Sequence, residues 1–331
     1  MSRRRLRILT WHVHGSYLYY LSQAPHEFFL PVRAGRPEGY GGRSGSFSWG
    51  TNVHEVQADR VHSLDFDCVL YQSRRNYRED RADLLSDAQL RGPQLYLEHD
   101  PPTQHPTAQP HPVDDPEIPV IHVTHFNRLM WDTGRSPVRV IRHGVMVPDV
   151  TSTGRMERGI TVVNNLFRRG RRLGPDLFEA AAREIPIDLA GMDSEARGGL
   201  GGLPRDRLLP IEAGYRFFFN PIRYTSLGLA VCEAMMLGLP VVALATTELP
   251  AVIENGRTGF LDTSLEPLIE KMRWLLTDAA EARRIGTAAR ESARDLFGID
   301  RFVRDWDAVF QEAAGFAGAP VAHPLMKETQ V

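Results

Sequence analysis

The segment Phe217–Asp262 reads FFFNPIRYTSLGLAVCEAMMLGLPVVALATTELPAVIENGRTGFLD. It predicts a strand, a turn, a helix over 227–237, a second strand, a loop and a short hairpin. Gly228 lies just inside the predicted helix start, where unpaired N–H groups and a partial positive charge suit a phosphate or diphosphate. Glu233 lies five residues further on, far enough from the phosphate to accept hydrogen bonds from a ribose. The segment therefore predicts a nucleotide-sugar site.

The same segment carries several pieces of a known signature. They are Gly228, the run Glu233-Ala234-Met235, the run from Gly238 to Val242 and the run from Gly256 to Leu261. Together these pieces resemble the C-terminal signature of retaining glycosyltransferases of the GT-B fold, family 4 or group 1 type. The resemblance implies two Rossmann-like domains facing a cleft. It also implies a nucleoside diphosphate sugar donor, a hydroxyl acceptor, retention of anomeric configuration, and neither a metal nor any other cofactor.

One position departs from that signature. The first of the family's paired acids would stand eight residues before Glu233, where this chain has Thr225. In the family that acid helps to hold the donor sugar hydroxyls, so the departure leaves the donor sugar open. Two alternatives to a transferase also stay open: a GT-B-fold sugar-nucleotide-binding protein with degenerate catalysis, and a nucleotide-sugar epimerase. A dinucleotide-dependent oxidoreductase is disfavoured, because no G-x-G-x-x-G follows the first predicted strand.

Length and composition indicate the number and the class of the domains. A chain of 331 residues suits two α/β domains, and its 42% hydrophobic and 24% charged residues are typical of a soluble globular protein. We predict an N-terminal, acceptor-side Rossmann-like domain over 1–150, a C-terminal donor domain over 151–313 and a flexible tail over 314–331. Short apolar runs that alternate with helical segments predict a doubly wound parallel sheet in each domain. One long helix is expected over 76–90, and a final helix over 299–313 is expected to cross back onto the first domain.

Charge and cysteine content narrow the partners. A net charge of −2 gives no reason to expect nucleic acid. Two cysteines, Cys68 and Cys232, are too few for a disulfide framework or a zinc site, which favours the cytoplasm. The basic start, with Arg3, Arg4, Arg5 and Arg7, could contact the membrane surface peripherally from the cytosolic side, although a solvated terminus is the simpler interpretation.

The first half offers two candidate site segments. Gly15 and Ser16 follow the first predicted strand, where Gly15 permits close backbone approach and Ser16 can cap the next helix. In the family this loop faces the donor diphosphate. His99, at the end of the strand over 94–98, is the candidate to contact the donor sugar or the transferring oxygen, with Glu98 and Asp100 as competing groups.

The second half offers the cations and the helix start. In the family an Arg and then a Lys-Gly follow the first strand of the donor domain and neutralise the diphosphate. Here Asn165 replaces the Arg, and Arg169-Gly170 matches Lys-Gly imperfectly. We predict Arg169, and after it Arg168, as the catalytic cations. The predicted donor-binding residues at the helix start, besides Glu233, are Thr225, Ser226, Leu227 and Gly228.

Overall fold

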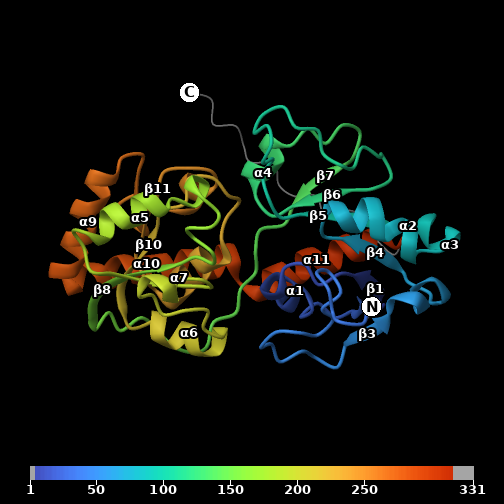
Figure 1. The fold of residues 1–331 in the computed structure, drawn as a ribbon, viewed down its shortest axis with the longest axis horizontal. Helices are drawn as coiled ribbons and strands as arrows, with labels where there is room; N and C mark the ends of the chain where they lie inside the picture. Colours follow the sequence, from blue (N-terminus) through green and yellow to red (C-terminus); the bar gives the residue numbers. More distant parts are fainter. Residues whose placement is uncertain (1–3, 316–331) are drawn as a thin grey trace.

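The computed structural model describes residues 4–315, which form two lobes side by side (Figure 1). Each lobe is built on a parallel sheet, so the predicted α/β class with two doubly wound sheets is confirmed. The predicted flexible tail lies outside the described residues apart from Ala314 and Gly315, as do residues 1–3 of the basic start.

The first sheet has the order β3-β2-β1-β4-β5-β6-β7 and all its neighbours are parallel. The order reverses between β1 and β4, and ligands in such sheets bind at the carboxyl ends of the strands at this reversal. Its strands are β1 Arg7–Thr10, β2 Glu27–Val32, β3 Val53–Gln57, β4 Cys68–Tyr71, β5 Gln94–Glu98, β6 Val120–His122 and β7 Val138–Val140. Its helices include α1 Gly15–Leu21, α2 Arg81–Leu84, α3 Asp87–Leu90 and α4 His125–Met130.

The second sheet has the order β12-β11-β10-β8-β9, and here the order reverses between β8 and β10. Every residue of β10 is buried, as expected for a central parallel strand covered on both faces. The strands are β8 Met156–Val162, β9 Ile187–Ala190, β10 Tyr215–Asn220, β11 Val241–Leu244 and β12 Gly259–Asp262. The helices are α5 Pro175–Ala182, α6 Arg205–Glu212, α7 Leu229–Leu237, α8 Leu249–Val252, α9 Leu265–Thr277 and α10 Ala279–Phe297.

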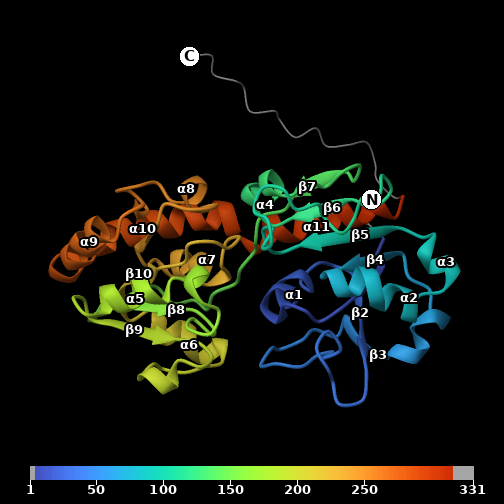
Figure 2. The same ribbon diagram turned by 45° about the horizontal axis from the view of Figure 1, so that its top comes forward.

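The last helix, α11 (Ile299–Ala313), returns to the first lobe, as predicted (Figure 2). Trp306 Nε1 donates a 3.1 Å hydrogen bond to the Tyr17 hydroxyl on α1. Gly144 packs against the same helix so closely that an added Cβ would lie 2.3 Å from the Cβ of Phe302. The chain therefore crosses between the lobes twice, once between β7 and β8 and once between α10 and α11.

The single helix expected over 76–90 is wrong. The segment forms a π-helical turn, η2 (Asn76–Asp80), followed by the short helices α2 and α3. Ser86 interrupts it: its backbone is extended, and its side chain accepts a hydrogen bond from the N–H of Gln89 in a capping box that starts α3. Helix α6 and edge strand β3 were not foreseen, because α6 contains Pro210 and β3 has five residues of which only Val53 is buried.

Candidate functional site

The start of α7 is open to solvent-accessible space. Gly228 is the N-cap residue, and a Cβ added to it would meet no atom within 4 Å. The first-turn N–H groups of Leu229 and Ala230 donate to no residue within the described chain, and both residues are only partly buried. The turn follows β10, at the reversal of strand order in the second sheet. Free donors and the positive end of the helix thus meet an empty volume, which is the arrangement that binds a phosphate.

Glu233, one turn further along α7, is only 8% exposed and is held from both lobes. The Tyr20 hydroxyl on α1 donates to its Oε1 at 2.6 Å, and Arg205 Nε on α6 donates to the same oxygen at 2.9 Å. Oε2 accepts no hydrogen bond from a described residue and is not fully buried. One oxygen therefore fixes the side chain, and the other is free to accept from a ligand hydroxyl.

A second carboxyl group lies behind this pair. Glu212 at the end of α6 is buried, and burial followed by the charge of Glu233 raises its pKa well above the usual range. Protonated Glu212 carries no charge and does not compete with Glu233 for the Arg205 guanidinium. Arg205 therefore remains the counter-ion of Glu233, as the 2.9 Å contact indicates.

Contacts from the first lobe and from a neighbouring loop hold the turn before α7. His143 Nε2 lies 2.8 Å from the carbonyl oxygen of Leu227, and Thr124 Oγ1 lies 3.5 Å from Ser226 Oγ. Thr247, after β11, donates from Oγ1 to the Ser226 carbonyl and has a φ of 53°, a strained value for a β-branched residue. Thr225 is partly exposed and its hydroxyl bonds to no described residue. The predicted donor loop is therefore fixed through Ser226 and Leu227, whereas the Thr225 side chain contributes no hydrogen bond to it.

His99 has a defined tautomer. Gln72 Nε2 donates to Thr10 Oγ1 and to the carbonyl of Trp11, both at 2.8 Å, so Gln72 Oε1 points the other way. That oxygen lies 3.2 Å from His99 Nε2, which must therefore carry the proton and donate. Nδ1 of His99 is left as an acceptor without a partner in the described structure, and it is not fully buried. His99 can thus accept a hydrogen bond from a substrate hydroxyl.

An aromatic cluster keeps His99 neutral. The His14 ring lies 4.2 Å and the Tyr17 ring 4.8 Å from the His99 ring, centroid to centroid. Burial, followed by the charges of His14 and His143, lowers the pKa of His99 well below its usual range. Burial also lowers the pKa of His143 to about 4 and that of His14 in the same direction. These imidazoles are neutral near pH 7 and act as hydrogen-bonding groups.

The two acids beside His99 differ in availability. Glu98 Oε1 accepts from the backbone N–H of Asp100 at 2.9 Å, and Oε2 lies 3.2 Å from His111 Nε2. Both oxygens are occupied, and burial raises the pKa of Glu98, so this residue organises the loop. The carboxylate of Asp100 is different, because its charge acts on both His14 and Arg169.

The two predicted arginines point to different surroundings. Arg168 has a side chain that is 75% exposed and lies 3.8 Å from Asp193, within the second lobe. Arg169 lies near enough to Asp100 and His14 of the first lobe for its charge to act on the pKa of His14. Asn165, in the position of the family's Arg, has a left-handed backbone with a φ of 55° and accepts the Arg169 N–H through its carbonyl. The geometry favours Arg169 as the cation of the cleft.

Gly15 and Ser16 begin α1, but the predicted capping by Ser16 is wrong. The N-cap residue is His14, and its side chain makes no capping hydrogen bond. Gly15 is needed for space, because an added Cβ would lie 2.9 Å from the Phe47 ring and 3.0 Å from His12 Nε2. The loop therefore lies beside His99 and His14 at the carboxyl end of β1, with its backbone closely packed.

Several site residues escaped the sequence analysis: Tyr20, Gln72 and Arg205. No local pattern marks them, since each acts on a residue at least 27 positions away. Glu248, in the loop after β11, accepts at 2.8 Å from the N–H of Phe126 and so links the two lobes.

Comparisons with known proteins bear on this site. Residues 200–278, which contain α7 and Glu233, match the family model described as glycosyl transferases group 1. This segment carries the group 1 glycosyltransferase signature. Sulfoquinovosyl transferase SQD2 of Arabidopsis thaliana is 41% identical over 96 residues, which is 28% of this chain and 19% of that protein. D-inositol 3-phosphate glycosyltransferase of Corynebacterium efficiens is 30% identical over 125 residues, 37% of this chain and 29% of that protein. The matches thus span less than a third of these relatives.

Solved structures extend the likeness beyond the group 1 segment. Sucrose-phosphate synthase from Thermosynechococcus elongatus superposes with a TM-score of 0.73 at 16% identity, over 95% of this chain and 100% of that one. HepE of Anabaena, solved in complex with UDP-glucose, superposes with a TM-score of 0.68 at 14% identity, over 93% of this chain and 100% of that one. At such identities the likeness shows the fold, which is the predicted GT-B arrangement.

Residues 4–315 contain neither a metal-ligating cluster nor a membrane-spanning helix. No group of three or more His, Cys, Asp or Glu side chains in this range is placed to hold a metal ion. None of the helices in the same range combines the length and apolar character needed to cross a membrane.

Proposed function

We propose that this protein is a retaining glycosyltransferase that moves a sugar from a nucleoside diphosphate donor to an acceptor hydroxyl. The observation that carries the proposal is the open start of α7 with Glu233 Oε2 free beside it, inside the group 1 segment. A diphosphate at Leu229 and Ala230 would place its ribose one turn along the helix, within reach of Glu233. The complex of HepE with UDP-glucose supports a nucleotide sugar as donor.

Departure of the diphosphate is the step that most requires transition-state stabilisation, because negative charge develops on the bridging oxygen as the glycosidic bond breaks. Arg169 and the first-turn N–H groups of α7 would stabilise that charge by electrostatics. The resemblance implies that this suffices without a metal. Adding EDTA to the assay is therefore expected to leave turnover unchanged.

His99 has the second role. Its neutral ring keeps a lone pair on Nδ1, which would accept a hydrogen bond from a hydroxyl of the donor sugar and orient the anomeric carbon. In a retaining transfer the acceptor oxygen arrives on the face from which the diphosphate leaves. The acceptor proton can then pass to the departing phosphate oxygen, so no separate protein base is required.

The proposal is tested by isothermal titration with UDP, GDP, ADP and TDP. We expect one of them to bind the wild-type protein and to bind Glu233→Ala at least about tenfold more weakly, since a charge-assisted hydrogen bond contributes roughly 1.5–3 kcal/mol. Tyr20→Phe is the matched control, because it removes a hydrogen bond from Glu233 but leaves Oε2 in place. Glu233→Gln serves if the alanine variant does not fold.

The nucleotide titration tests the donor site, and the assay with sugar donors tests the transfer reaction. If none of the four nucleotides binds the folded wild type, the donor site is refuted. If one binds but the matching sugar donors yield no glycoside with any acceptor tried, the degenerate binding protein becomes the better account of Thr225 and Asn165. Release of the nucleoside diphosphate without transfer would instead favour the epimerase.

A further inference from the structure

The first lobe contains a cavity of about 630 Å³ at the carboxyl ends of β1, β4 and β5. His14 and His99 line its inner end, and Arg74 and Arg78 line it from the segment after β4. Neutral polar side chains of the proline-rich loop, Thr103, Gln104 and Gln109, complete the wall. The cavity therefore connects the proposed reaction centre with a pair of arginines that the proposed mechanism does not use.

Arg74 and Arg78 are without counter-ions. Neither side chain forms an ion pair or a hydrogen bond with any residue in the described range 4–315, and both are exposed. The acids of this segment serve Arg75 instead, whose Nε lies 3.8 Å from both Glu79 Oε2 and Asp80 Oδ1. Two like charges four residues apart repel each other and destabilise a helical turn. Their position in a cavity wall indicates a ligand that supplies the missing negative charge.

The acids elsewhere in the cavity do not cancel that charge. Both oxygens of Glu98 are occupied by His111 and by the N–H of Asp100, and burial raises the pKa of Glu98. Asp100 acts on His14 and Arg169 at the inner end. The charges of Arg74 and Arg78 reach Tyr96 on β5, where they oppose the rise in its pKa that burial and the charges of Glu98 and Asp100 cause. Arg74 and Arg78 therefore add positive charge to the cavity that no ion pair in the described range balances.

We propose that the acceptor carries an anionic group, a phosphate or a carboxylate, which Arg74 and Arg78 bind while its hydroxyl points toward His99. Arg74 and Arg78 stand four residues apart on the helical segment after β4 and line the same cavity, so two guanidinium groups can bracket one such anion. That the anion belongs to the acceptor substrate rests on the proposed function. The anion site itself is measurable without any nucleotide.

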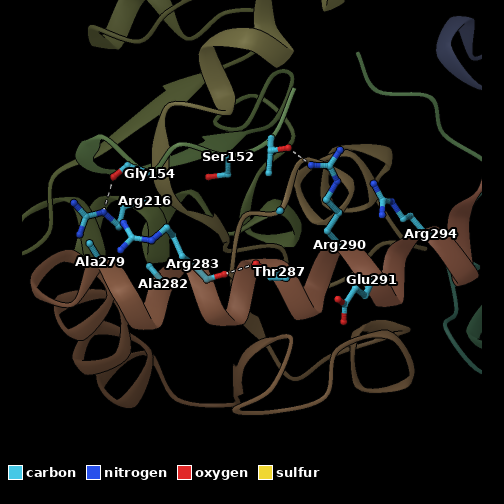
Figure 3. Close-up of a pocket in the computed structure, with 12 residues that line it drawn as sticks. Ser152, Gly154, Arg216, Ala279, Ala282, Arg283, Thr287, Arg290, Glu291 and Arg294 are labelled. Atoms are coloured by element: carbon cyan, nitrogen blue, oxygen red, sulfur yellow. Dashed lines mark hydrogen bonds between the residues drawn. The ribbon is translucent and has the colours of Figure 1, made fainter. Parts of the chain in front are cut away.

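A second arginine-lined pocket on α10 provides an internal comparison (Figure 3). There Arg216 donates to the carbonyl of Gly154, and Arg290 donates to Thr151 Oγ1. Arg283 and Arg294 are the arginines of that pocket whose side chains have no described partner, and they are three turns apart on the helix. They cannot bracket one small anion, so their replacement is the matched control for the pair in the first lobe.

The experiment is an isothermal titration at low ionic strength with inorganic phosphate, succinate and neutral glycerol. We expect wild type to bind phosphate or succinate but not glycerol, and Arg74→Gln/Arg78→Gln to bind the anion at least about tenfold more weakly, as expected for the loss of charge-assisted hydrogen bonds. Arg283→Gln/Arg294→Gln is expected to bind as wild type does. The stronger of the two anions identifies the acidic group.

Three results would overturn the proposal. The first is no binding of either anion to wild type at millimolar concentration. The second is unchanged binding by the Arg74/Arg78 variant. The third is loss of binding in Arg169→Gln in place of that variant, which would put the anion at the donor diphosphate site. Failure of the nucleotide titration with the Glu233 variants would refute the donor site alone, so the two proposals fail separately.

Discussion

Replacing Tyr20 by Phe tests how the two lobes are joined at Glu233. The substitution removes one hydroxyl, whose 2.6 Å hydrogen bond to a buried carboxylate crosses from α1 to α7. Arg205 still donates to the same oxygen, and its guanidinium lies 5.2 Å from the centre of a ring that Phe retains. The Glu233 carboxylate therefore keeps its hydrogen bond from Arg205, and the substitution removes one charge-assisted hydrogen bond.

The expected loss in the free energy of unfolding follows from that geometry. A hydrogen bond to a charged group contributes about 1.5–3 kcal/mol, and the remaining Arg205 contact places this one near the lower end, at roughly 2 kcal/mol. For a chain of this length that loss lowers the melting temperature by about 3 °C. Urea unfolding of Tyr20→Phe gives the free energy directly, and a double-mutant cycle with Glu233→Gln should give a coupling energy of about 1 kcal/mol.

The neighbouring tyrosine provides the control. Tyr19 lies on the same helix, and its ring stacks on Phe47 while its hydroxyl bonds to no residue of the described chain. Tyr19→Phe should therefore change the free energy of unfolding by less than about 0.5 kcal/mol. If Tyr20→Phe behaves like Tyr19→Phe, or if its effect simply adds to that of Glu233→Gln, the proposed tie between the lobes does not exist.

Three further outcomes are expected. Burial holds the pKa of His143 near 4 in the folded protein, so its neutral form stabilises the fold at pH 7 and that contribution, up to about 3 kcal/mol, is lost as the pH falls from about 6.5 to 4. His143→Gln, which can still donate to the Leu227 carbonyl, should flatten the acid limb of a stability–pH curve measured by urea unfolding; a curve parallel to wild type would contradict this. Arg169→Gln should lower kcat about a hundredfold to a thousandfold in a glycosyl-transfer assay, as loss of a charge-stabilising donor does, whereas Arg168→Gln should stay near wild type; equal losses would reject the assignment of the cleft cation. Gly144→Ala should destabilise the protein by about 2 kcal/mol or more in thermal unfolding, because the new methyl group overlaps Phe302 on α11, and an unchanged melting temperature would show that α11 is not seated there.

The sequence predicted the elements that depend on local pattern. Buried runs such as Phe217–Phe219 predict a central parallel strand, and the segment that starts near Gly228 predicts the helix that carries Glu233; the structure has both. The break at Ser86 was missed although its capping box spans only the four residues from Ser86 to Gln89, because the apolar periodicity on either side continues the helical pattern. Edge strand β3 gave too short a signal.

The candidate site was predicted only in part, because its polar partners come from distant segments. Tyr20 and Glu233 are 213 positions apart, and their contact depends on how the two lobes pack. His99 was chosen from its place after a strand, but its usable nitrogen depends on Gln72, which is fixed in turn by Thr10 and Trp11. Sequence spacing carries no information on such chains of hydrogen bonds.

The contacts of Glu233 suggest why an acid is kept in the middle of an otherwise apolar helix. A buried carboxylate costs free energy unless its oxygens are satisfied, and Tyr20 and Arg205 satisfy only Oε1. Oε2 accepts a hydrogen bond only when a ligand hydroxyl, such as that of a ribose, binds beside it. Because Tyr20 belongs to the first lobe and Arg205 to the second, the carboxylate is fixed in its final orientation only when the lobes are together. Nucleotide binding and lobe closure should therefore favour each other. Tyr20→Phe, which weakens closure without removing Oε2, should weaken nucleotide binding measurably but by less than Glu233→Ala does, and isothermal titration of both variants checks this order.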